Sequence, residues 1–178
     1  SHPCRTISYG VESNAEYRAE QIDYAPTQTS FAIKSGSGLR EGYSTHLAGR
    51  GNILNLLAAV AVADLMQVPE AQQKRAMRQI EQIEHRLSIK RTAGGITIID
   101  DAYNSNPEGC IEAVNVLGSF EGFKKVIITP GLVELGTKEY EYNKNLGFNA
   151  AEKCDIIILV GKNRSVPIKD GVLEHGFN

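Results

Sequence analysis

Short runs of branched apolar residues recur through the second half of the sequence. They occupy residues 87–91, 96–99, 126–129 and 155–160, and a polar segment followed by a helical pattern comes after each of the last three. Unbroken apolar strands that alternate with helices predict a mainly parallel sheet covered on both faces. The C-terminal part of the chain is therefore predicted to be an α/β domain.

The same region carries signals for three helices. Asn106 and Pro107 fit an N-cap followed by proline at the first helical position. Thr137 is predicted to cap a second helix, and residues 166–178 are predicted to form a third. The residues expected to face inward are Ile111, Val114 and Leu117 in the first helix and Leu146, Ala150 and Cys154 in the second.

Ligands of such sheets bind beyond the carboxyl ends of the strands. Three polar segments follow strands here, at residues 100–106, 130–136 and 161–165. These segments are the candidate functional site.

The first half of the chain has a different pattern. Residues 1–46 are rich in β-branched and aromatic residues, with strands expected around 7–9, 17–24 and 27–33. From Asn52, a candidate N-cap, the apolar period becomes helical through Ile53, Leu56, Leu57 and Val60. Pro69 separates a second helix, whose apolar face is expected at Ala76, Ile80, Ile83 and Leu87.

Composition excludes several classes of protein. The net charge of -2 argues against a nucleic-acid partner, and the apolar stretch at residues 53–63 is far too short to span a membrane. The three cysteines, Cys4, Cys110 and Cys154, are scattered, which is typical of reduced thiols in a cytosolic protein. Cys110 and Cys154 are predicted to be core residues.

The most informative run is residues 100–107, Asp-Asp-Ala-Tyr-Asn-Ser-Asn-Pro. It places two carboxylates, a phenol and two amides at a strand-to-helix turn. A carboxylate there can accept hydrogen bonds from a ribose diol, and the helix N-terminus beyond it favours anionic groups. Strand-end polarity with a good N-cap explains the same residues equally well.

This run resembles the signature of the Mur ligase family of ATP-dependent amide ligases, in the form that adds D-alanyl-D-alanine to UDP-N-acetylmuramoyl-tripeptide. The resemblance implies a Rossmann-like, mainly parallel C-terminal domain at residues 85–178. It is preceded by the β-strand and helical end of the family's central ATP-binding domain at residues 1–84. By the same resemblance, Asp101 would contact adenosine, and Tyr103, Asn104 and Asn106 would line the acceptor pocket.

Three further segments resemble the family in order and spacing. Residues 49–55 match a motif in which asparagines lie by the adenine, so Asn52 and Asn55 are expected there, although Gly51 stands where the family has histidine. Arg86 matches an arginine that swings over the nucleotide to meet the γ-phosphate, although an arginine at a helix end is usually a solvated cap. Glu134 would bind the acceptor ammonium, or else pin its own loop.

The resemblance implies that ATP phosphorylates the tripeptide carboxylate and that the D-alanyl-D-alanine amine attacks the acyl phosphate. It places the enzyme in the cytoplasm, as a monomer, in the cell wall synthesis that supports cell shape and division. No G-x-x-x-x-G-K-[ST] motif occurs. The phosphate loop and the Mg²⁺ ligands are therefore expected upstream of residue 1, and the fragment alone is expected to be inactive. The alternatives are another Mur-type amino-acid ligase or a non-catalytic nucleotide-binding module.

Overall fold

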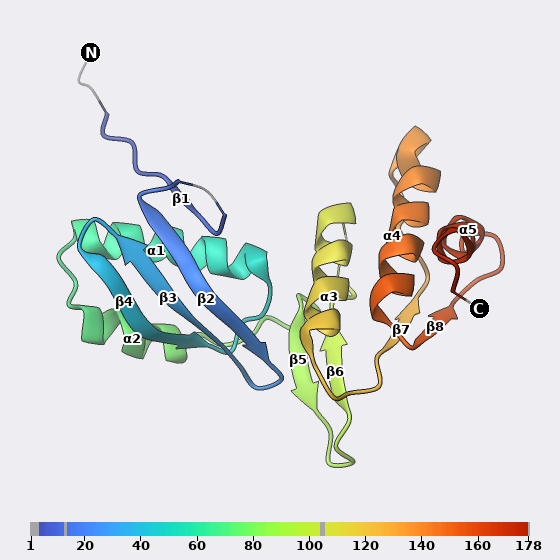
Figure 1. Cartoon of the computed structure of the whole chain (residues 1–178), viewed down its shortest axis with the longest axis horizontal. Helices are drawn as coiled ribbons and strands as arrows, with labels where there is room; N and C mark the ends of the chain where they lie inside the picture. Colours follow the sequence, from blue (N-terminus) through green and yellow to red (C-terminus); the bar gives the residue numbers. More distant parts are fainter. Residues whose placement is uncertain (1–3, 13, 104–105, 178) are drawn as a thin grey trace. The chain divides into compact units, whose positions relative to one another are not determined.

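Apolar side chains gather in two separate cores, and the chain divides into two units, Ser1–Ile98 and Ile99–Asn178. The computed structural model describes residues 4–12, 14–103 and 106–177 (Figure 1). Within these ranges no helix is long and apolar enough to cross a membrane. The domain boundary expected between residues 84 and 85 stays a prediction.

The first unit contains a four-stranded sheet in the order β1-β2-β3-β4. β1 (Tyr9–Gly10) runs parallel to β2 (Tyr17–Ala25), and antiparallel pairing joins β2 to β3 (Gln28–Ser35) and β3 to β4 (Gly38–Thr45). The expectation of β structure up to about residue 46 is confirmed.

Two helices, α1 (Arg50–Leu65) and α2 (Glu70–Arg78), pack on this sheet (Figure 1). Their shared core is formed by Ala19, Phe31, Ile33 and Tyr43 from the strands and by Ile53, Leu56, Leu57, Val60 and Met77 from the helices. The helical period predicted from residue 53 to residue 60 is therefore confirmed. Each of these larger side chains stabilises the unit by about 1.5–3 kcal/mol through its removal from water.

The start of α1 differs from the expectation. Gly49 occupies the N-cap position with φ 90° and ψ 151°, a region that only glycine enters readily, and Asn52 lies inside the first turn. The prediction that Asn52 caps the helix is wrong, because the glycine lets the chain enter the helix earlier.

The second helix is shorter than expected. It ends at Arg78 and buries Gln73 and Met77, whereas Ile80 and Ile83 are 37% and 64% exposed. The predicted apolar face was therefore wrong at Ala76, which is exposed within the helix, and at Ile80 and Ile83, which lie beyond it. A buried glutamine took the place that an apolar period would assign to a hydrophobic residue.

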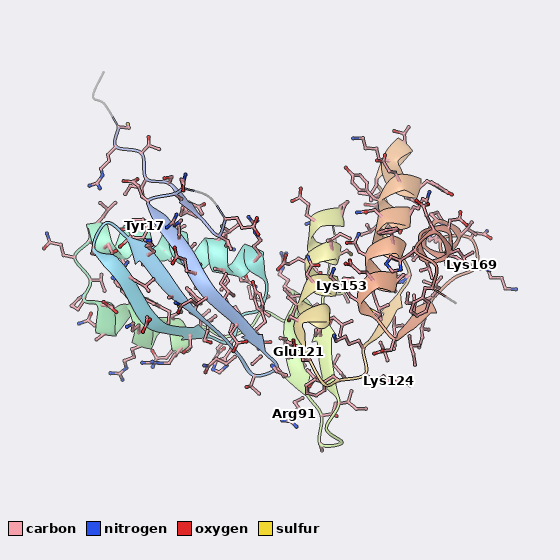
Figure 2. The ribbon with its side chains drawn as sticks, in the orientation of Figure 1. Tyr17, Arg91, Glu121, Lys124, Lys153 and Lys169 are labelled. Carbon is pink, nitrogen blue, oxygen red and sulfur yellow. The ribbon has the colours of Figure 1, made fainter. Side chains whose placement is uncertain are left out.

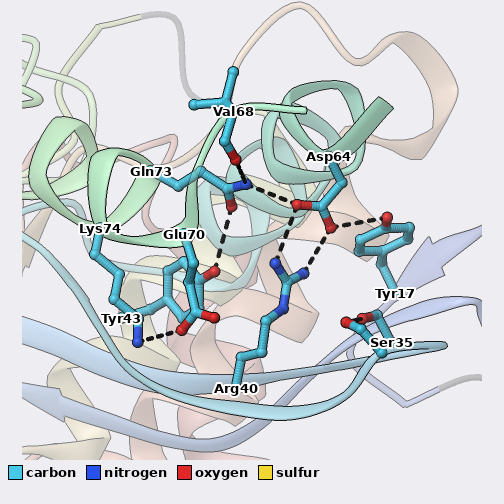
Figure 3. Close-up of polar contacts among 10 residues, drawn as sticks. Tyr17, Ser35, Arg40, Tyr43, Asp64, Val68, Glu70, Gln73 and Lys74 are labelled. Atoms are coloured by element: carbon cyan, nitrogen blue, oxygen red, sulfur yellow. Dashed lines mark hydrogen bonds and ion pairs between the residues drawn. The ribbon is translucent and has the colours of Figure 1, made fainter. Parts of the chain in front are cut away.

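Asp64, in the last turn of α1, joins four elements through its carboxylate (Figure 3). It accepts hydrogen bonds from the Tyr17 hydroxyl at 2.9 Å, from Arg40 Nη1 and Nη2 at 3.1 and 2.8 Å, and from Gln73 Nε2 at 2.7 Å. Tyr17, Arg40 and Gln73 belong to β2, β4 and α2 respectively. One side chain thus fixes both helices to the sheet.

The electrostatics of this network favour the ionised carboxylate. Burial acts to raise the pKa of Asp64, but the hydrogen bonds from Arg40, Gln73 and Tyr17 outweigh it and hold the pKa below its ordinary value. Burial also raises the pKa of the nearby Tyr43 to about 12, so this phenol stays neutral and donates to Gln73 Oε1 at 3.3 Å.

The second unit has the predicted α/β rhythm. β5 (Ser88–Arg91) and β6 (Thr97–Asp100) form a two-stranded sheet, and the boundary between the units falls within β6. α3 (Pro107–Ser119) then leads to β7 (Val126–Thr129). A 3-10 turn (Gly136–Lys138) and α4 (Glu139–Lys153) lead to β8 (Ile156–Leu159), and α5 (Val166–Glu174) follows.

β7 and β8 pair in parallel, with Val126 opposite Ile156 and Thr129 opposite Leu159. The fold class, α/β with parallel strands, is confirmed. Exposure alternates along both strands, so that Ile128 and Ile158 are 66% and 45% exposed while their neighbours are half-buried. The strands are therefore covered on one side here, whereas the sequence pattern predicted cover on both.

The start of α4 also differs from the expectation. Thr137 lies in the 3-10 turn, and the N-cap position belongs to Lys138. The predicted threonine cap is wrong, because the 3-10 turn moves the helix start towards Glu139.

Close approach of helices sets the packing of this unit. A Cβ at Gly147 of α4 would overlap the Ile168 carbonyl, and one at Gly171 of α5 would overlap the Lys144 carbonyl. Lys153 of α4 is labelled in Figure 2, and a Cβ at Gly118 of α3 would lie 2.9 Å from its Cδ. The α4–α5 pair therefore depends on glycine at positions 147 and 171, because the opposing atoms are backbone, whereas the flexible Lys153 side chain opposite Gly118 can move aside.

Replacing Asp64 with Asn should lower the free energy of unfolding by about 2–3 kcal/mol at neutral pH, because it leaves the Arg40 guanidinium largely buried without its anion. Since the native pKa of Asp64 is depressed, its contribution is complete above about pH 4 and is lost as the pH falls through the native pKa. Denaturant unfolding of wild type and variant at several pH values should give a difference that shrinks with acid.

The matched control is Glu20→Gln, which breaks the more exposed Arg18–Glu20 pair at 3.0 Å. It should cost under about 1 kcal/mol. Equal costs for the two variants would contradict the assigned importance of Asp64.

Replacing Gly171 with Ala should destabilise the second unit by more than about 3 kcal/mol, because the new methyl group would meet helix backbone, which cannot move aside cheaply. Gly51→Ala is the control, since nothing lies within 4 Å of a Cβ there and a helical alanine stabilises by up to about 1 kcal/mol. Hydrogen exchange of α4 and α5 measures the effect, and unchanged exchange in the Gly171 variant would refute it.

Candidate functional site

The two asparagines expected at the nucleotide lie on the first turns of α1. Asn52 is half-buried and its Nδ2 donates to the Ala48 carbonyl at 2.7 Å, which orients the amide. Asn55, one turn further along, is exposed. Asn52 therefore does not act as an N-cap. An amide held in one orientation can pair with the donor and acceptor groups on the edge of a base.

Gly51 lies on the same turn, where the family resemblance expects a histidine. It is exposed, and a Cβ built on it would meet nothing within 4 Å. The backbone at this position therefore leaves room for a side chain.

Arg86 lies between α2 and β5 with an exposed side chain, and its backbone N–H donates to the Ile83 carbonyl at 3.2 Å. The residues on either side, His85 and Leu87, have φ values of 60° and 49°. Two left-handed non-glycine residues around one arginine mark a strained segment, which is typical of switch and ligand-contact regions.

The segment after β6 carries the predicted carboxylates. Asp100 Oδ1 accepts a hydrogen bond from the Ala102 N–H at 3.2 Å, so this side chain stabilises the turn. Asp101 is half-buried and Tyr103 is 59% exposed. Asn104 lies outside the described residues.

Asn106 is the N-cap of α3, and its Oδ1 accepts the Gly109 N–H at 2.8 Å. The predicted cap, with Pro107 in the first turn, is confirmed. The Asn106 oxygen therefore already accepts one hydrogen bond from its own helix.

The loop after β7 has an unusual backbone. Gly131, Glu134 and Gly136 have φ values of 83°, 62° and 57°, so three of its residues are left-handed and one of them is not glycine. Glu134 is exposed between Leu132, which is buried, and Leu135, which packs on the same core. The loop is anchored by its apolar residues and presents a carboxylate.

A residue that the sequence did not single out holds this loop. Asn143 of α4 is 2% exposed and bonds to both the N–H and the carbonyl of Leu132. It lies three residues before Leu146 on the apolar face of α4, so a lone amide within an apolar stripe was the available signal.

The core of the second unit brings two predicted segments together. Cys110 and Ile111, in the first turns of α3, pack against the same cluster as Leu132 and Leu135 of the β7 loop. The first turns of α3 and the loop after β7 therefore pack on one hydrophobic cluster. Asn52, Asn55 and Arg86 belong to the first unit.

The third segment, residues 161–165, is held by a hydrogen bond between its two ends. Ser165 Oγ donates to the Gly161 carbonyl, and Gly161 has φ 92°.

The three cysteines are free, and burial raises the pKa of the Cys154 thiol to about 11, as expected for a core residue.

The part of the chain that the structure describes offers few clustered metal-ligating side chains. No group of three or more His, Cys, Asp or Glu side chains there could hold a metal ion.

Comparison with known proteins gives two family matches. Residues 1–63 match the Mur ligase middle domain, and residues 85–175 match the Mur ligase, glutamate ligase domain. The UDP-N-acetylmuramoyl-tripeptide--D-alanyl-D-alanine ligase of Bacillus subtilis (strain 168) is 27% identical over 177 residues, which cover 98% of this chain and 38% of that protein.

Two further proteins are similar to this chain. The UDP-N-acetylmuramate--L-alanine ligase of Sorangium cellulosum (strain So ce56) is 36% identical over 106 residues, 59% of this chain and 22% of the relative. A crystal structure of MurF from Acinetobacter baumannii superposes with a TM-score of 0.79 at 27% identity, covering 94% of this chain and 36% of that one.

The chain thus spans well under half the length of the relatives that it matches. The match to the glutamate ligase domain alone extends over more than half of the 178 residues. Together with the α/β fold and the polar segments at its strand ends, this match shows that the chain belongs to the Mur ligase family.

Proposed function

We propose that this chain supplies the nucleotide-closing and acceptor-binding part of an ATP-dependent ligase that joins D-alanyl-D-alanine to UDP-N-acetylmuramoyl-tripeptide. The observation that carries the proposal is the similarity to D-alanyl-D-alanine ligases over nearly the whole chain, in sequence and in fold. The run at residues 100–107 adds the signature that distinguishes this form of the family.

The chemistry assigned to the complete enzyme has two steps. An oxygen of the tripeptide carboxylate attacks the γ-phosphorus of ATP, which forms an acyl phosphate and releases ADP. The deprotonated amine of the dipeptide then attacks the acyl carbon, and the tetrahedral intermediate collapses to an amide and inorganic phosphate. The reaction would take place in the cytoplasm as a step of peptidoglycan synthesis.

The residues of this chain would act by positioning and by charge. Asn52 and Asn55 would contact adenine, and Asp101 would accept hydrogen bonds from the ribose diol. Arg86 would meet the phosphate charge, for which the permanent charge and fixed fork of donors of a guanidinium are suited. Such electrostatic positioning is the main source of rate enhancement in phosphoryl transfer.

The acceptor pocket is assigned to the second unit. Glu134 would hold the ammonium of the dipeptide, and Tyr103, Asn104 and Asn106 would line the pocket. This assignment is supported by the packing of the first turns of α3 and the β7 loop on one cluster.

A panel of acceptors tests the proposal. Full-length protein, given ATP and UDP-N-acetylmuramoyl-tripeptide, should release ADP with D-alanyl-D-alanine and show at least about tenfold lower kcat/KM with L-alanine, D-glutamate or a diamino acid. Mass spectrometry of the product should show the added dipeptide. Release with one of the other amines alone would identify a sister ligase.

The sister activity that this panel must separate is L-alanine addition. A stretch of 106 residues of this chain is 36% identical to an L-alanine-adding enzyme, which is a higher identity over a shorter span than the match to the D-alanyl-D-alanine ligase. Absence of both ATP affinity and ADP release would instead support the non-catalytic module, for which Gly51 in place of histidine is the motivating feature.

Replacing Arg86 with Ala should lower kcat about 100-fold in the full-length enzyme, because one charge contact to the transferring phosphoryl group is lost. The side chain is exposed, so the thermal midpoint should stay within about 2 °C of wild type. Arg91→Ala, which removes another exposed arginine from the end of β5, is the control. An unchanged rate in the Arg86 variant would remove Arg86 from the mechanism.

A further inference from the structure

We propose that Asn143 is the positioning residue of the acceptor site, because it fixes the β7 loop in the conformation that presents Glu134. The inference rests on the proposed role of Glu134 in binding the acceptor amine. Asn143 itself is buried and is not placed in contact with any substrate.

The Asn143 amide is fully engaged with backbone. Its Oδ1 accepts the Leu132 N–H at 2.8 Å, and its Nδ2 donates to the Leu132 carbonyl at 2.9 Å and to the Glu139 carbonyl at 2.9 Å. The side chain therefore pairs with Leu132 on both sides, as a neighbouring strand would. It also ties this pairing to the first turn of α4.

The loop can approach Asn143 only because residue 131 is glycine. A Cβ there would lie 2.7 Å from Asn143 Oδ1, and the φ of 83° is itself a left-handed conformation that favours glycine. On its other side the Gly131 N–H donates to Thr129 Oγ1 at 3.0 Å. Thr129, Gly131 and Asn143 together restrict the backbone of this loop to one conformation.

Glu134 lies two residues after Leu132, the residue that Asn143 holds. Its φ of 62° is an unfavourable conformation for a residue with a side chain. Such strain persists only where the surroundings over-determine the backbone. Here Leu132 is held by Asn143 and by burial at 3% exposure, and Leu135 packs on the same cluster. These two anchors hold the exposed carboxylate between them.

An aliphatic residue of similar size at position 143 would keep the core filled but leave the buried N–H and carbonyl of Leu132 without their partner. Unpaired buried backbone groups drive the chain to a different conformation. The loop would then move, and the carboxylate of Glu134 would move with it. The change should therefore weaken binding of the acceptor rather than binding of ATP.

The test compares Asn143→Leu and Asn143→Asp in the full-length ligase with Asn149→Leu. Asn149 lies on the same helix and bonds only within it, Nδ2 to the Asn145 carbonyl at 2.8 Å. The Asn143→Leu variant should raise KM for the acceptor about tenfold, while KM for ATP stays within about twofold. Asn143→Asp keeps the bond from the Leu132 N–H and should fall between, and Asn149→Leu should match wild type.

A second measurement does not depend on the acceptor. Hydrogen exchange of residues 130–136 should be faster in the Asn143→Leu variant than in wild type and unchanged in Asn149→Leu. Gly131→Ala reaches the same contact from the loop side and should speed exchange in the same residues, even if Asn143→Leu fails to fold.

The outcomes separate the two proposals. If wild type uses a different amine, the variants are compared with wild type by their KM for that amine. If no amine is used, the proposed function fails, and exchange alone decides the role of Asn143. Unchanged exchange in folded Asn143→Leu, or KM values for acceptor and ATP that rise together, would overturn the inference.

Discussion

Parallel pairing of β7 and β8 is the constraint on which the second unit depends. Parallel strands cannot be joined by a tight turn, so the chain must return along a crossover helix. That helix is α4, and its return path brings Asn143 under the loop that leaves β7. The same pairing places the loops after both strands at one edge of the sheet, so the strand direction determines where a site can form and what supports it.

Both units use one buried or half-buried polar side chain to fix several elements. Asp64 joins two strands and two helices in the first unit, and Asn143 joins a loop to a helix in the second. In each case nearly every donor and acceptor of the side chain is used. A fully satisfied polar group specifies one arrangement, because any other arrangement leaves a buried group unpaired.

Local signals in the sequence predicted the elements that local physics determines. The strand at residues 126–129 and the cap formed by Asn106 and Pro107 were predicted correctly, because β-branched runs and helix caps act within a few residues. The C-terminal end of α2 and the start of α4 were not, since the bonds of buried Gln73 to other elements override propensity in α2, and a 3-10 turn precedes α4. Asn143 could not be assigned a role, because its partner lies in a loop whose path no local pattern describes.

The glycine contact between α4 and α5 restricts how this protein can diverge. Every single-base change that alters a glycine codon adds a Cβ or stops translation, and a Cβ at Gly147 or Gly171 would overlap the backbone of the opposite helix. Neither position can therefore drift through conservative intermediates. A change at either position would first require the two helices to move apart. The spacing of the helices and the two glycines should therefore change only together.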